Sequence, residues 1–245
     1  MKKISTLLCF FFAAIIAVAS PYGFGDHGTL DKKHKKYFVA LGYGIGQAKW
    51  FSRFQNTDLL STDGSVIETG NTTFQTQNAI KMLNLEVSFP VDRVRLGMGI
   101  SFENFYLDKL YFTSPSTIAS NYIIFDDNIR FDKFYGMIEI PFNPETNKEY
   151  SFSMLGRLGY YGYNGLAHLG FFGQSALAST YLANVGFLAD YELFTQTYVY
   201  VSPCLEFKYF RNNKNEEPSI IVHDIYSASI VFGIRVDLGV KKNPL

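Results

Sequence analysis

Residues 94–103 read Val-Arg-Leu-Gly-Met-Gly-Ile-Ser-Phe-Glu and form the cleanest alternation of apolar and polar residues in the chain. Successive side chains of an extended strand point to opposite faces, so this stretch has one face of large apolar groups and one face of small or charged groups. We predict a strand over residues 93–107. One face suits an apolar environment and the other a polar environment, so the fold must separate the two.

The same alternation recurs in seven other segments, each of which is predicted to be a strand. Their bounds are 37–50, 76–89, 129–142, 149–163, 180–193, 198–211 and 223–240. Short turns are expected at 90–92, 143–148 and 194–197, and long loops over 51–75, 108–128, 164–179 and 212–222. Turns at one rim and loops at the other are typical of membrane barrels. The predicted fold is all-β: an eight-stranded antiparallel up-and-down transmembrane β-barrel with short periplasmic turns and long extracellular loops.

The chain begins like a secretory signal peptide, with two lysines, an apolar stretch and a final Ala-Val-Ala over residues 17–19. We expect cleavage after Ala19. The predicted organisation is a signal peptide over 1–19, a periplasmic lead-in over 20–36, an outer-membrane β-barrel over 37–240 and a C-terminal tail over 241–245. After the signal peptide no apolar run is long enough for a spanning helix, so a membrane-embedded mature chain is expected to cross with strands.

The composition also fits an exported β protein. Aromatic residues make up 17% of the chain, which suits strands and membrane interfaces. The 22 basic and 22 acidic residues balance, and no basic patch predicts binding to nucleic acid. Only Cys204 remains after removal of the signal peptide, so no intramolecular disulfide is expected.

Alternation alone does not decide which face of the barrel is inside. A secreted or periplasmic lipocalin-like carrier also has eight strands in simple order, with its apolar face turned inward around an apolar ligand. Three features favour the membrane barrel. One is the sharp split between short turns and long loops. The polar faces are rich in Gly and Ser, which suit a crowded lumen, and aromatic residues gather at strand ends, as at Tyr37, Phe89 and Phe142.

The last predicted strand reads Gly-Ile-Arg-Val-Asp-Leu over residues 233–238. Together with the eight-strand pattern, this ending resembles the assembly signal of small outer-membrane β-barrel proteins of the OmpA/OmpX and PorT-like type. Val236 and Leu238 stand where such proteins carry a terminal aromatic residue. The resemblance covers nearly the whole mature chain and implies insertion into outer-membrane lipid by the barrel-assembly machinery. It implies no single activity, because one scaffold serves many functions.

Three glutamates, Glu86, Glu139 and Glu192, recur at an interval of 53 residues, each between apolar neighbours and shortly before a turn. An eight-stranded barrel is only wide enough for its own side chains to fill it. The predicted lumen network comprises Glu86, Glu139, Glu192, Glu206, Arg95, Arg157, Arg235, Lys208 and Asp237. Because an uncompensated buried charge is costly, the glutamates near the turns are expected to pair with Arg95 and Arg235. A gated proton or ion path is the functional alternative.

An enzymatic alternative rests on the eighth predicted strand. A lipid-modifying enzyme of the outer membrane needs a serine with a nearby histidine and an orienting acid. His223, Ser227 and Ser229 share the inward parity, whereas Asp224 points to the other face. An inward-facing set lies away from lipid, so we predict no enzymatic activity. No Cys pair, His cluster or calcium-loop motif predicts a metal or cofactor.

The predicted loops contain large apolar residues that a solvated loop does not require. Either the strands extend past the membrane and bury them, or they form a binding surface for an extracellular ligand or protein. The candidate surface comprises Tyr111, Phe112, Tyr122, Phe125, Phe171 and Phe172. We therefore expect a non-enzymatic structural or surface-binding protein that acts through its extracellular loops.

Overall fold

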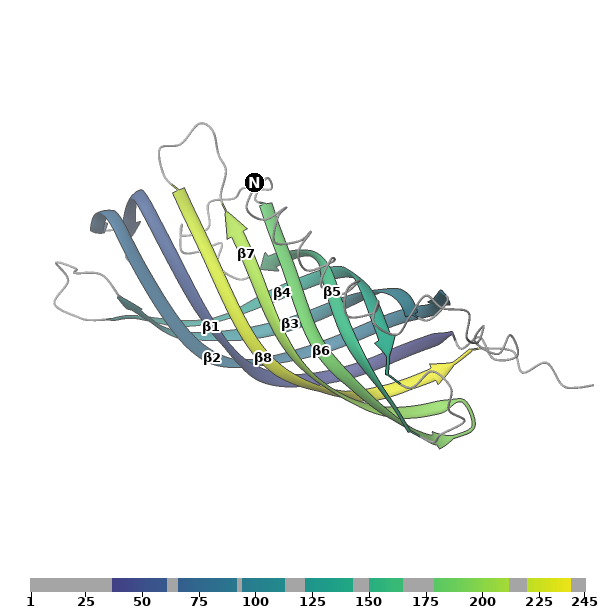
Figure 1. The fold of residues 1–245 in the computed structure, drawn as a ribbon. Coiled ribbons are helices and arrows are strands. Elements are labelled where there is room, and N and C mark those ends of the chain that lie inside the picture. The colour runs from purple at the N-terminus through teal and green to yellow at the C-terminus, as the bar shows by residue number, and fades with distance from the viewer. Residues whose placement is uncertain are drawn as a thin grey trace, which may run out of the picture.

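The computed structural model describes residues 37–60, 66–91, 94–112, 122–142, 150–164, 179–211 and 220–238. The strands close into one antiparallel barrel, in which each pairs with its sequence neighbour and the last pairs with the first (Figure 1). They are β1 (Phe38–Leu60), β2 (Val66–Val91), β3 (Val94–Phe112), β4 (Tyr122–Pro141), β5 (Tyr150–Asn164), β6 (Ser179–Phe194), β7 (Thr197–Arg211) and β8 (Ile220–Asp237). The predicted eight-stranded antiparallel barrel is confirmed.

The described residues contain no helix that is long and apolar enough to cross a membrane. The predicted signal peptide (1–19), lead-in (20–36) and tail (241–245) lie outside the described residues.

The strands extend further at the loop end of the barrel than the sequence predicted. β1 continues to Leu60 and β2 begins at Val66, so most of the predicted loop over 51–75 is strand. β3 and β4 likewise take up much of the predicted loop over 108–128. The prediction was wrong here because the alternation of apolar and polar residues ends before the strands do. Arg53 pairs with Thr73, for example, so backbone pairing continues where the alternation has ended.

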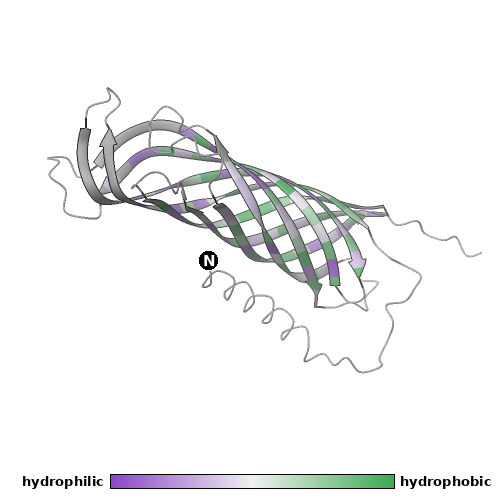
Figure 2. Ribbon diagram, turned by 90° about the horizontal axis from the view of Figure 1, so that it is seen from above, coloured by the Kyte–Doolittle hydropathy of each residue, from purple (hydrophilic) through white to green (hydrophobic). Residues whose placement is uncertain are grey.

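Large apolar side chains point outward from the strands and are exposed. Figure 2 shows the resulting alternation of hydrophobic and hydrophilic positions along each strand. We call the outward set the apolar belt; it comprises Leu41, Tyr43, Ile45, Leu83, Leu85, Val87, Leu96, Met98, Ile100, Phe102, Phe134, Phe152, Tyr160, Val185, Phe187, Val199, Leu205, Ile230, Phe232, Ile234 and Val236. Towards the loops, outward positions become polar, as at Lys49 on β1 and Lys81 on β2.

The inner face is divided between two kinds of filling. Near the turns it holds buried polar and charged side chains such as Glu139 and Arg157. Near the loops it holds large buried aromatic groups such as Trp50, Phe105 and Phe131. The charged half lies behind the apolar belt, so the barrel wall separates paired charges inside from apolar groups outside.

Two inward glycines allow β8 to close on β1. Gly42 and Gly233 are register partners, and Tyr200 of β7 fills the space beside them. A Cβ atom added to Gly233 would lie 2.2 Å from the carbonyl oxygen of Leu41 and 2.6 Å from the Tyr200 ring. The seam therefore needs glycine, because the carbonyl belongs to the paired backbone and cannot move aside.

Pro203 lies within β7, in a barrel that leaves no strand at an edge. Proline has no N–H group to donate to the neighbouring strand. The β6–β7 register keeps one offset from Ser179 to Glu192, with a gap in the ladder opposite Pro203, and it shifts only at Phe194 beside the turn. The Ser202 hydroxyl donates to the carbonyl oxygen of Phe187 at 2.7 Å. A side chain thus supplies the donor that the proline lacks.

Candidate functional site: the charged barrel interior

Glu139 of β4 is the centre of the charge cluster nearest the turns. Its carboxylate accepts hydrogen bonds from Arg95 of β3 and from Arg235 of β8, the latter at 2.7 Å. Ser153 of β5 donates to Glu139 at 3.0 Å, and Arg235 also donates to Asp190 of β6 at 2.8 Å. Glu139 is fully buried, so these direct partners compensate its charge. The cluster links five strands through the lumen.

Glu86 of β2 is the centre of the middle cluster. Arg157 of β5 donates from Nε to Glu86 at 2.8 Å, and the Tyr135 hydroxyl donates to the same carboxylate at 2.8 Å. The Arg157 guanidinium also donates to the amide oxygen of Asn184 at 3.0 Å and contacts Cys204 Sγ at 3.4 Å. All five side chains are buried, so this cluster is a packed cross-link between strands.

The third cluster is a ring of alternating charge formed by Glu103 of β3, Lys133 of β4 and two residues of β7, Glu206 and Lys208. Each ammonium group contacts both carboxylates. Lys208 Nζ lies 2.6 Å from Glu103 and 2.8 Å from Glu206, and its side chain is fully buried. Two lysines and two glutamates make the ring neutral, which offsets the cost of removing four charges from water.

The three clusters together balance five cations against five carboxylates. A cavity between the first two clusters measures about 10 Å³, which is room for about one water molecule. This space is far too small for an open pore. Among the described residues, no three His, Cys, Asp or Glu side chains are grouped so that they could hold a metal ion. The arrangement is suited to cross-linking strands rather than to binding a solute.

An aromatic core fills the lumen on the loop side of the charged ring. The Trp50 ring centroid lies 5.6 Å from that of Phe105 and 6.0 Å from that of Phe131. Lys208 Nζ lies 5.3 Å from the Phe131 ring centroid, so the core rests directly on the charged ring.

His223 belongs to this core and is 2% exposed. Trp50 Nε1 lies 3.1 Å from His223 Nδ1 and can only donate, so Nδ1 is the acceptor and the imidazole is neutral. Ser52 Oγ lies 2.7 Å from the same nitrogen. His223 thus connects β8 to β1.

The enzymatic set considered from sequence is not assembled. Ser227 and Ser229 share the face of His223 but lie four and six residues away along β8, or roughly 13 and 20 Å at the rise of a strand. Asp224 faces outward and accepts a hydrogen bond from Arg53 at 2.7 Å. The shared parity was correct, but residues on one strand at this spacing cannot form a hydrogen-bonded triad.

Two members of the predicted network lie apart from the three clusters, near the turns. Glu192 accepts hydrogen bonds from the Gln196 N–H and the Tyr198 hydroxyl, each at 3.2 Å. Asp237 accepts from the Tyr37 N–H at 3.1 Å. These carboxylates stabilise a turn and the junction of the first and last strands.

The predicted pairing of the glutamates with Arg95 and Arg235 is found for Glu139 alone among the described ion pairs. Glu86 shares a cross-strand row with Tyr135, which lies four residues further from the turn than Glu139. The equal spacing of 53 residues therefore does not give the glutamates a common set of partners.

The sequence prediction omitted three charged residues that are central to these clusters: Glu103, Lys133 and Asp190. Each lies on the same face of its strand as a residue that was included. Lys133 has the parity of Glu139, Asp190 that of Glu192, and Glu103 that of Arg95. Continuing the alternation to the ends of the strands would have found them.

The residues of the candidate loop surface fall in different places. Tyr111 lies in β3 and is 44% exposed. Phe112, Tyr122 and Phe125 also lie within strands rather than in a loop, and their side chains lie outside the described part. Phe171 and Phe172 lie outside the described residues altogether.

No family model and no curated protein matches the sequence. Solved structures with a similar fold include the outer membrane protein OprG of Pseudomonas aeruginosa, with 10% identity, 85% of this chain and 99% of OprG covered, and a TM-score of 0.49. The outer membrane protease OmpT of Escherichia coli shares 10% identity over 86% of this chain and 100% of its own, with a TM-score of 0.43. Neisserial surface protein A shares 10% identity over 80% and 97%, with a TM-score of 0.38. At these values the likeness describes the shape of a barrel and assigns neither an activity nor a ligand.

Proposed function

We propose that this protein is an integral β-barrel of a bacterial outer membrane and works without catalysis, as a structural and surface-binding protein. The observation that carries the proposal is the apolar belt on the outside of a barrel filled with paired charges. Leu41, Phe134 and Phe187 are 55%, 57% and 56% exposed. Soluble monomers rarely expose contiguous apolar patches of more than a few hundred Å². Contact with acyl chains instead of water removes the free-energy cost of exposing this apolar surface. A closed barrel also pairs the backbone groups of its strands, as a bilayer requires.

The inner face argues against a soluble, lipocalin-like carrier. Such a carrier encloses an apolar ligand cavity and presents polar groups to water. Here the lumen behind the belt holds fully buried charges such as Glu139 and Lys208, around a cavity of about 10 Å³. The loop side is filled by packed aromatic groups around Trp50. Non-catalytic action is supported by the burial of His223, the histidine on which the enzymatic alternative depended.

The connections after β2 and β6 are short and lie at the same rim of the barrel. We place this rim in the periplasm, as is usual for outer-membrane barrels. The opposite rim, with the connections over 113–121 and 165–178, would then face outwards. The ending over 233–238 also supports kinship with OmpA/OmpX-like or PorT-like barrels and insertion by the barrel-assembly machinery. Depleting that machinery should reduce the amount of folded protein in the outer-membrane fraction.

Membrane fractionation combined with gel mobility before and after boiling tests the proposal. We expect the protein in the outer-membrane fraction, with unboiled protein migrating differently because the closed barrel resists detergent. Recovery of folded protein in the soluble fraction without detergent would overturn the proposal and favour the soluble carrier.

The loop assignment needs a separate test, because the barrel would fold without it. Residues 108–126 can be replaced by Asn-Gly, which joins two paired strands in a tight turn. Leu107 pairs with Asp127, so the shortened hairpin keeps its register and loses Tyr111, Phe112, Tyr122 and Phe125 of the candidate surface. We expect an unchanged heat-modifiable band but weaker adhesion of intact cells to hexadecane, a probe of exposed apolar groups. Replacement of 212–219, which contains no aromatic residue, serves as a control, and unchanged adhesion after replacing 108–126 would refute the assignment.

A further inference from the structure

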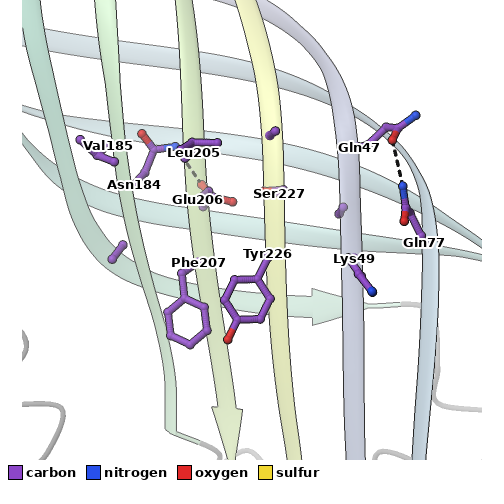
Figure 3. Close-up of a pocket in the computed structure, with 13 residues that line it drawn as sticks. Gln47, Lys49, Gln77, Asn184, Val185, Leu205, Glu206, Phe207, Tyr226 and Ser227 are labelled. Atoms are coloured by element: carbon purple, nitrogen blue, oxygen red, sulfur yellow. Dashed lines mark hydrogen bonds between the residues drawn. The ribbon is translucent and has the colours of Figure 1, made fainter. Parts of the chain in front are cut away.

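A groove of about 540 Å³ crosses the outside of the barrel wall over β6, β7, β8, β1 and β2 (Figure 3). This volume lies in the range of pockets that hold a single small ligand. Two outward rows of register partners line the groove. The row nearer the loops is Ala183, Phe207, Tyr226, Lys49 and Gln77, and the row nearer the turns is Val185, Leu205, Ala228 and Gln47.

Small residues hollow out the wall between these rows. Ala183 and Ala228 occupy outward positions where most neighbouring positions carry large groups. Beneath them, Asn184 and Glu206 turn their side chains into the lumen, where Asn184 donates to Glu206 at 3.4 Å. The Glu206 carboxylate is already bound by two lysines of the charged ring. The acid under the groove therefore does not repel an anion above it.

The chemistry of the groove changes along its length. Its β6–β7 end is apolar and includes Val185 and Leu205, the latter 62% exposed. Its β1–β2 end is polar, with Lys49 exposed and Gln77 donating to Gln47 at 3.0 Å. A molecule that follows the groove must be apolar at one end and polar at the other.

The groove also crosses the edge of the apolar belt. On β1 the unbroken run of outward apolar residues ends at Ile45, and polar Gln47 and Lys49 follow it before Phe51. On β6 and β7 the outward aromatic residues Tyr181 and Tyr209 lie beyond the groove on its loop side. Because barrel strands are tilted, a row of register partners runs obliquely to the membrane plane. The apolar end therefore lies within the belt, and the polar end lies at its surface.

Lys49 provides the positive charge of the groove. Among the described residues, no carboxylate forms an ion pair with it, in contrast to Arg53 on the same strand, which binds Asp224. Its ammonium group lies 4.9 Å from the centroid of the Phe51 ring. This cation at the membrane surface is available to an anion and suits a phosphate group.

We propose that the groove binds an anionic lipid that carries a phosphate group, with one acyl chain along Val185, Leu205 and Phe207 and the phosphate group at Lys49. The inference rests on the proposed membrane location, because only there would the groove meet lipid at this depth. The graded lining, the oblique position and the available lysine each point to the same kind of occupant.

Native mass spectrometry of the full chain, released from detergent with equal amounts of phosphatidylglycerol and phosphatidylcholine, tests the headgroup site. We expect the wild type to retain phosphatidylglycerol preferentially. Lys49→Gln should lower that preference about fivefold, which corresponds to about 1 kcal/mol for one lysine at a membrane surface. Lys81→Gln makes the same charge change at an outward position of β2 outside the groove and should have no effect.

The acyl site is tested by filling it. Ala228→Phe should abolish retention of both lipids, whereas Ala79→Phe, at an exposed β2 position outside the groove, should leave retention unchanged. Equal retention of both lipids by the wild type, equal effects of the two lysine variants, or retention by Ala228→Phe would overturn the groove assignment. Each variant is first checked for a heat-modifiable band. A folded barrel without lipid preference refutes the groove alone, whereas a detergent-independent soluble chain refutes the membrane location as well.

Discussion

At the scale of single residues, the barrel depends on charges that are buried but matched. Arg157 illustrates this, because its guanidinium binds a carboxylate, an amide oxygen and a sulfur atom contributed by three other strands. Alternation along β5 predicted that Arg157 points inward, but it did not identify Glu86 as the partner. Partner choice depends on the register of strands that are not adjacent in the chain. The local sequence therefore predicts the face of the strand on which a charge lies, but not the residues with which that charge pairs.

Removing the Arg157 guanidinium should destabilise the barrel strongly. In Arg157→Met the Glu86 carboxylate loses its cation while staying buried, and we expect the free energy of unfolding to fall by about 3–5 kcal/mol. Urea unfolding in detergent or lipid can be followed through Trp50, the single tryptophan of the chain. The matched control is Arg53→Met, which breaks an ion pair whose arginine is 56% exposed and should cost at most about 1 kcal/mol. Equal losses in both variants would contradict the role given to the buried pair.

At the scale of strands, pairing is more persistent than the hydrophobic pattern. β1 and β2 continue to pair beyond the belt, where the alternation of apolar and polar residues has ended, so the pattern underestimated their length. Pro203 shows the opposite case, since a residue that disfavours a central strand is accommodated within β7. The Ser202 hydroxyl makes this possible, and its role was not visible in the sequence because it depends on the carbonyl group of Phe187 on β6.

A double-mutant cycle tests this substitution of donors. Ser202→Ala should destabilise the barrel by about 1–3 kcal/mol, because it leaves the Phe187 carbonyl without its donor. In a Pro203→Ala background the backbone N–H is restored, and the same Ser202→Ala change should cost measurably less. Ser227→Ala is the control, since the buried Ser227 hydroxyl has no hydrogen-bond partner within the described residues. Identical costs of Ser202→Ala in the two backgrounds would show that the hydroxyl does not replace the proline donor.

At the scale of the whole molecule, the barrel wall faces apolar groups outwards and paired charges inwards. This arrangement has a low energy only if the surroundings are apolar. A soluble barrel with the same strand order would require the reverse. The position of the belt relative to the charged clusters is therefore the strongest physical support for a membrane location.

The response of the belt to a charge distinguishes lipid from water. Leu41 lies in the middle of the outward apolar run of β1 and is 55% exposed. Leu41→Arg should destabilise the barrel in phosphatidylcholine vesicles by about 2–4 kcal/mol if this position faces the bilayer core. Gln77→Arg, at an exposed position beyond the belt, should cost about 1 kcal/mol or less. In water an exposed substitution at Leu41 would change stability by only about 0.5 kcal/mol, which would contradict a lipid-facing belt.

Side-chain alternation is a local property of an extended backbone, so it predicted the number of strands, their order and which charges of one strand share a face. It assigned Glu139 and Arg95 to one inner surface before any contact was known. Other features could not be predicted locally: Lys133 and Lys208 share two carboxylates, His223 meets Ser52 rather than the serines of its own strand, and five strands form a graded groove. These features depend on closure and register, which bring together residues that lie far apart in the chain.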